Sequence, residues 1–66
     1  MTAHEKVIYI IQQLELSDSK VARAIQKGVS TTTHKRMKLR GAKFSEEEFT
    51  RLRDFYLEKL RKIEML

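Results

Sequence analysis

The side chains best suited to chemistry in this chain are basic, and they lie together in its middle. Between Ser19 and Ser45 there are eight basic residues and no acidic one, whereas the rest of the chain has six basic and nine acidic residues. The eight are Lys20, Arg23, Lys27, Lys35, Arg36, Lys38, Arg40 and Lys43. A net charge of +5 concentrated in one segment indicates a surface that binds a polyanion, with DNA as the first candidate.

The remaining residue types do not support catalysis. The chain has no cysteine, no Cys/His spacing for zinc, no glycine-rich phosphate loop and no clustered Ser, His and Asp set. The acidic run Glu46–Glu48 is explained by its place at a helix start, where negative charge is favourable. We therefore expect a protein that is not an enzyme, with no cofactor, no metal and no small-molecule substrate.

Length and hydropathy set further limits. The longest apolar run, Val7–Ile11, has five residues, which is too few for a membrane span or a signal-peptide core. We therefore expect a cytoplasmic protein that does not bind membranes. Sixty-six residues form one domain at most, 1–66, and a chain this short is only marginally stable by itself.

Apolar spacing and capping signals predict four helices, at about 3–14, 18–27, 31–39 and 46–64. Thr2 with Glu5, and Ser45 with Glu48, have capping-box spacing. Gly28 is expected to end the second helix in the left-handed conformation. The predicted fold is an all-α, compact four-helix domain.

The fourth helix has an unusually wide apolar face. Its apolar residues cover roughly half of the circumference, more than the ~100° stripe of an ordinary surface helix. Two interpretations stay open: the helix is sunk deep in a small core, or one edge packs on the core and the other on a second copy. We favour the dimer slightly, because so small a domain has little else to stabilise it. Its interface would then consist of Phe55, Leu57, Ile63 and Leu66.

The central part of the chain resembles the helix-turn-helix of the lambda-repressor-like family, the small Cro and repressor proteins of phages and their bacterial relatives. The family has apolar, Ala and apolar residues at the fourth, fifth and eighth motif positions, which Val21, Ala22 and Ile25 match. It then expects Gly directly after the eighth position. Here Gln26 stands there and Gly28 comes two residues later. We therefore expect a turn lengthened by two residues.

This resemblance implies a transcriptional regulator that binds double-stranded DNA as a homodimer, with the helix at 31–39 in the major groove. Ser30 would cap that helix, and Val29, His34 and Met37 would face inward. Base edges would be read by Thr31, Thr32, Lys35 and Arg36. Phosphates would be bound by Lys20, Arg23, Ser30, Lys38, Arg40 and Lys43. His4 is expected to be an ordinary exposed residue of the first helix.

Two other functions fit the same charge pattern. The main alternative is a small basic helical module that binds an acidic protein, as an antirepressor, antitoxin or phage-type inhibitor would. An RNA-binding helical protein is third, because no Phe, Tyr or Trp on which single-stranded bases could stack occurs between the first and last of these cations, Lys20 and Lys43. Sequence-selective DNA binding distinguishes the first function from both alternatives.

Overall fold

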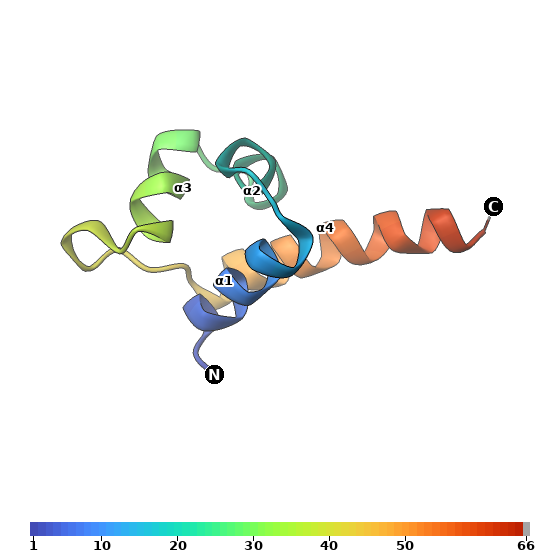
Figure 1. Ribbon diagram of the computed structural model, residues 1–66, viewed down its shortest axis with the longest axis horizontal. Coiled ribbons are helices and arrows are strands. Elements are labelled where there is room, and N and C mark those ends of the chain that lie inside the picture. Colours follow the sequence, from blue (N-terminus) through green and yellow to red (C-terminus); the bar gives the residue numbers. More distant parts are fainter. Residues whose placement is uncertain (66) are drawn as a thin grey trace.

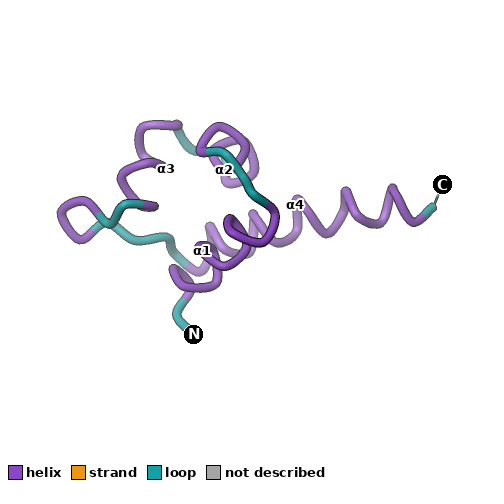
Figure 2. The backbone as a smooth tube through the Cα atoms, in the orientation of Figure 1, coloured by secondary structure: helices purple, strands orange, loops and turns teal. Residues whose placement is uncertain are grey.

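The chain folds into four α-helices and one short 3₁₀ turn, as Figures 1 and 2 show for a computed structural model in which residues 1–65 are described. The helices are α1 (Ala3–Leu14), α2 (Asp18–Ile25), α3 (Val29–Arg36) and α4 (Glu46–Glu64), and the 3₁₀ turn η1 covers Leu39–Gly41. The predicted all-α fold is confirmed, and the bounds of α1 and α4 agree with the prediction. In contrast, α2 ends two residues earlier than predicted, and α3 both begins and ends earlier.

Capping residues fix where three of the helices start. Thr2 and Glu5 form a complete capping box at α1, and Ser45 and Glu48 form a second one at α4. At α2 the Ser17 hydroxyl accepts a hydrogen bond from the backbone N–H of Lys20. These side chains satisfy N–H groups that have no partner inside their helix, so the local sequence alone defines the starts.

The core lies where α1, α2 and the first half of α4 meet. Its buried residues include Val7 from α1, Val21 and Ile25 from α2, Phe44 just before α4, and Leu52 from α4. Burying a side chain of this size stabilises the fold by about 1.5–3 kcal/mol relative to leaving it exposed. The core therefore holds the N-terminal half of α4 firmly against α1 and α2.

The C-terminal half of α4 extends beyond the other helices (Figure 1). The molecule measures 44 × 24 × 19 Å along its principal axes, and its longest dimension follows this helix. Leu57, Leu60 and Ile63 on this half are 44%, 50% and 63% exposed. The wide apolar face is thus divided: its first part packs in the core and its last part has no covering element among residues 1–65.

None of the helices in that range has both the length and the apolar character needed to cross a membrane.

The turn between α2 and α3 corrects the predicted register. Gln26, directly after Ile25, adopts the left-handed conformation (φ 61°, ψ 42°) that the family pattern reserves for Gly. The connection is therefore 26–28, directly after the eighth motif position, and α3 starts at Val29, two residues earlier than predicted, so the expected lengthening of the turn is wrong. Gly28 has φ −70° and serves as the N-cap of α3, so its expected left-handed role at the end of α2 is also wrong.

His4 is buried, and the expectation that it is exposed is wrong. Its side chain is 4% exposed, its ring stacks on Phe44 with centroids 5.5 Å apart, and its Nδ1 accepts a hydrogen bond from the Phe44 backbone N–H at 3.1 Å. Burial, reinforced by the nearby charges of Lys38 and Lys43, lowers the pKa of His4. The ring is therefore neutral and anchors the segment that leads into α4.

Gln26→Gly should stabilise the protein by about 0.5–1 kcal/mol, because the left-handed conformation strains a residue with a Cβ and is accessible to Gly without that strain. Thermal or urea denaturation measures this difference. Lys27→Gly is the matched control: Lys27 has no positive φ, so this change should lower stability instead. Equal effects of both variants would show that the conformation of Gln26 carries no strain.

Stability should decline as the pH falls below about 6.5, the ordinary pKa of His, because the unfolded chain then binds a proton that folded His4 resists. His4→Gln keeps an oxygen acceptor for Phe44 and should make the decline in Tm between pH 7 and pH 5 shallower. His34→Gln, which replaces an exposed histidine, is the control and should leave the decline in place. An unchanged pH profile for His4→Gln would assign the decline to other groups.

Candidate nucleic-acid interface

The N-terminus of α3 is open to a ligand. Gly28 provides no side-chain cap, and the first backbone hydrogen bond of the helix runs from Thr32 N–H to the Gly28 carbonyl. The N–H groups of Val29, Ser30 and Thr31 thus have no partner inside the helix. Such groups carry partial positive charge and can bind a phosphate oxygen.

One edge of α3 is attached to α4. Thr32 is fully buried, and its hydroxyl donates to the Gly28 carbonyl at 3.0 Å. One helical turn further on, Lys35 Nζ lies 2.6 Å from Glu48 Oε2, and the Glu48 side chain is 2% exposed. Burial by itself would raise the pKa of Glu48, but the hydrogen bonds from Lys35 and Ser45 outweigh it and the pKa is lowered. The Glu48 carboxylate is therefore ionised, and its contact with Lys35 connects the two helices.

A second contact attaches α3 to the start of α2. Arg36 donates to both carboxylate oxygens of Asp18, with Nε at 2.7 Å and one terminal nitrogen at 3.0 Å, and the Thr33 hydroxyl donates to the same carboxylate at 2.8 Å. The hydrogen bond from Arg36 lowers the pKa of Asp18, and the carboxylate in turn raises the pKa of Arg36. Two-point contact of this kind fixes orientation as well as distance.

These contacts engage or bury three of the four predicted base readers. Thr32 is buried, Lys35 is paired with Glu48 and Arg36 is paired with Asp18, so of the four predicted base readers only Thr31 is exposed and unpaired among the described residues. The cause is the turn. Each residue turns a helix by about 100°, so an error of two residues in the length of the turn moves the inward face to nearly the opposite side.

The outward face of α3 consists of exposed residues. Thr31 was predicted to lie there, whereas the prediction had placed Ser30, His34 and Met37, with Val29 at the start, elsewhere. The expected burial of Val29, His34 and Met37 is wrong, and Ser30 lies inside the helix instead of capping it. His34 Nδ1 donates to the Ser30 carbonyl at 2.7 Å. In the neutral ring this leaves Nε2 as a hydrogen-bond acceptor that points away from that contact.

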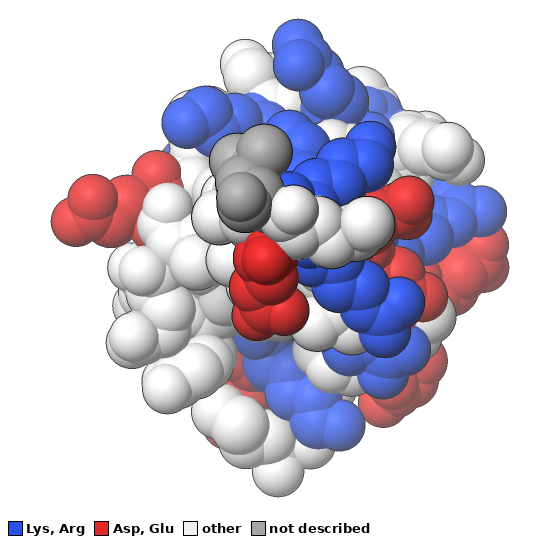
Figure 3. Space-filling model, turned by 90° about the vertical axis from the view of Figure 1, so that its right-hand side faces the viewer, with Lys and Arg blue, Asp and Glu red and all other residues white. Residues whose placement is uncertain are grey.

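Basic residues stand before and after α3 along the chain. Lys27 lies in the turn before α3, and Lys38, Arg40 and Lys43 follow it around η1; all four are exposed. Lys38 and Arg40 both have left-handed backbone conformations, which fold the segment into a tight loop beside α3. Acidic and basic side chains are, by contrast, interspersed at the end from which α4 projects (Figure 3).

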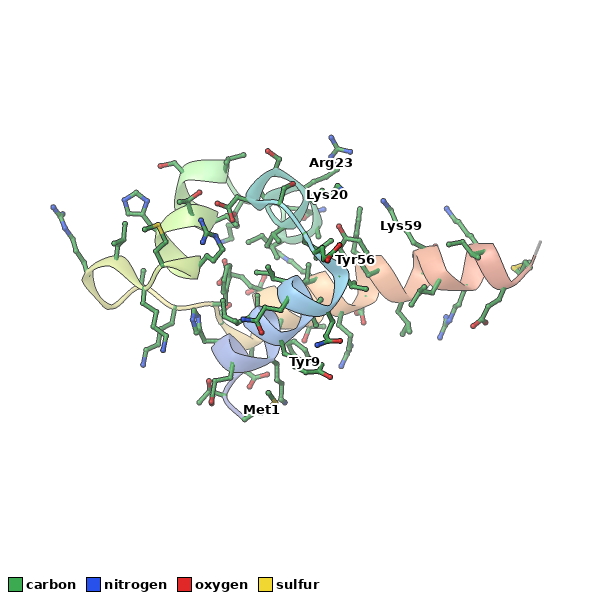
Figure 4. All side chains as sticks on the ribbon, viewed as in Figure 1. Met1, Tyr9, Lys20, Arg23, Tyr56 and Lys59 are labelled. Carbon is green, nitrogen blue, oxygen red and sulfur yellow. The ribbon has the colours of Figure 1, made fainter. Side chains whose placement is uncertain are left out.

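The other predicted phosphate ligands lie elsewhere. Lys20 and Arg23 are exposed on α2, but they line a pocket against Tyr56 and Lys59 of α4 (Figure 4). They are thus separated from the outward face of α3, on the side of α2 that meets α4. Thr31 shares the outward face of α3 with His34, which was predicted to be inward, whereas Lys38 and Lys43 line a pocket with Thr2 and His4 at the start of α1.

No known family model matches this chain, and no curated protein or solved structure is similar enough to count as a match. The lambda-repressor-like resemblance consequently depends on the motif residues and on the turn.

A signal for the correct register of the helix-turn-helix was present in the sequence. Gln26 stands directly after the eighth motif position, and reading it as a substitute for Gly gives the observed three-residue turn.

Proposed function

We propose that this protein is a sequence-specific DNA-binding regulator of the lambda-repressor-like kind, with α3 in the major groove of duplex DNA. The observation that carries the proposal is the three-residue turn at Gln26, because a helix-turn-helix joins its helices by three to four residues and this turn leaves α3 with an exposed face. That face has an open helix N-terminus on one side and a basic loop on the other. A major groove about 12 Å wide admits a helix in this way.

Base recognition would come from Thr31 and His34. The Thr31 hydroxyl can bond to several base edges, and His34 Nε2 can accept a hydrogen bond from the amino group of adenine or cytosine. Met37 and Val29, which are 54% and 48% exposed, can contact thymine methyl groups. Arg36 and Lys35 would act indirectly, since they hold α3 in place through Asp18 and Glu48.

Phosphate binding would come from the surroundings of α3. The unpartnered N–H groups at its start and the side chain of Lys27 would contact one strand. Lys38, Arg40 and Lys43 would contact the neighbouring backbone. Contacts of this type set the position of a protein on DNA, and they make affinity depend steeply on salt.

The proposal includes a homodimer formed by the projecting half of α4. Leu57 and Ile63 of the predicted interface are exposed there, as is Leu60. Phe55 is only partly exposed and packs against the core, which makes it a poor probe of dimerisation. Leu66 lies outside the described residues. A two-fold dimer would read half-sites about 34 Å apart on one face of the duplex.

Selection of bound sequences from random duplex DNA at moderate salt should enrich one motif with two-fold symmetry. On that motif, His34→Ala and Thr31→Ala should each weaken binding by about 1–3 kcal/mol and relax the preference at one base pair.

Arg40→Ala should weaken binding to all DNA sequences alike and reduce the slope of log affinity against log salt concentration by about 1. Gln13→Ala, exposed on α1 away from this face, is the control and should bind normally. An absence of enrichment would instead favour the basic protein-binding module.

Sedimentation at micromolar concentration should give the mass of two chains. Ile63→Glu should give the mass of one chain with unchanged helical content, because Ile63 lies on the projecting half of α4 and makes no contribution to the core cluster. Tyr9→Glu, an equally drastic change at an exposed position on α1, should leave the dimer intact. A wild-type chain that sediments as a monomer would refute the dimer.

A further inference from the structure

A pocket of about 320 Å³ lies where the end of α1, the side of α2 and the middle of α4 meet. Its apolar walls include Leu16, Phe55 and the ring of Tyr56, and its rim carries Lys20, Arg23 and Lys59. Figure 4 shows Lys20 and Arg23 on α2 and Tyr56 and Lys59 on α4, all on the same side of the molecule. Binding pockets of this size commonly combine apolar walls with a few convergent polar groups.

The positive charges at this pocket are not paired with any carboxylate of the described residues. None of their four ion pairs includes Lys20, Arg23 or Lys59. Lys59 Nζ lies instead over the aromatic wall, 4.6 Å from the centroid of Phe55 and 5.7 Å from that of Tyr56. Three cations around an apolar hollow attract negative charge, and the walls favour an apolar group beside that charge.

Tyr56 adds a neutral hydrogen-bond donor. Burial raises the pKa of its hydroxyl, which is therefore protonated at neutral pH, and that hydroxyl makes no hydrogen bond to any described residue. A carboxylate can accept hydrogen bonds from a phenol and from lysine or arginine at once. An inorganic anion has no apolar group, so it would make no apolar contact with Leu16 and Phe55.

We propose that this pocket binds a small organic anion with an apolar body, such as a medium-chain or aryl carboxylate. The carboxylate lies among Lys20, Arg23 and Lys59, and the apolar body packs on Leu16, Phe55 and the ring of Tyr56. The ligand thus contacts α2, the first helix of the helix-turn-helix, and α4 at the point where its projecting half begins. The site is separate from the outward face of α3.

The test uses the full chain without DNA. Octanoate, kept below its critical micelle concentration, is titrated while the backbone amide signals are followed by NMR. We expect saturable shifts centred on Leu16, Arg23 and residues 55–59. Acetate lacks the apolar body and octylammonium lacks the negative charge, so both should bind at least about tenfold more weakly, a difference of about 1.4 kcal/mol.

The combined change Arg23→Gln and Lys59→Gln should weaken octanoate binding at least about tenfold, again about 1.4 kcal/mol. Lys62→Gln, also exposed on α4 but outside the pocket lining, is the matched control and should bind octanoate like the wild type. Equal binding of acetate, equal binding of octylammonium, or unchanged binding by the double variant would each overturn the proposal. If the wild-type protein binds octanoate but shows no sequence selectivity for DNA, only the proposed function is overturned.

Discussion

The structure depends most on the carboxylate of Glu48. One of its oxygens accepts the Ser45 backbone N–H and so starts α4, and the other binds Lys35 and so holds α3. A carboxylate that is 2% exposed is costly to bury unless it is paired and hydrogen-bonded, and each oxygen of this one accepts a hydrogen bond. The same group therefore decides both where the long helix begins and how the candidate recognition helix is placed on it.

Asp18 plays the corresponding part for Arg36, the next residue of α3, which it connects to α2. Together the two carboxylates engage Lys35 and Arg36, two of the eight cations in the acid-free segment. Their charge is thereby used inside the protein, and the outward face of α3 is left neutral and polar. The exposed cations that precede and follow α3 in the chain belong to the turn and to the segment around η1. Such a division suits a helix that reads base edges while neighbouring segments bind phosphate.

The long helix α4 has two environments. Its first half belongs to the core through Leu52 and supports α1, α2 and, through Glu48, α3. Its second half leaves the core at the pocket beside Tyr56 and carries exposed apolar residues. A single amphipathic pattern runs through both halves, which is why the sequence alone left burial and dimerisation open. Among residues 1–65, the structure buries Leu52 of the first half and leaves Leu57, Leu60 and Ile63 of the second half exposed.

Local interactions determined what the sequence could predict. The capping boxes at Thr2 and Ser45 and the 3.6-residue spacing fixed the bounds of α1 and α4, because each depends on residues at most four positions apart. The rotation of α3 was decided by tertiary structure. It follows from the left-handed conformation of Gln26, which an L-residue adopts only when surrounding packing outweighs its strain, and from ion pairs 13 and 18 residues apart. The burial of His4 likewise depends on Phe44, 40 residues away. The sequence by itself thus determined the helices and the basic segment, and the tertiary structure decided which side of α3 is exposed, because long-range pairing leaves no local pattern.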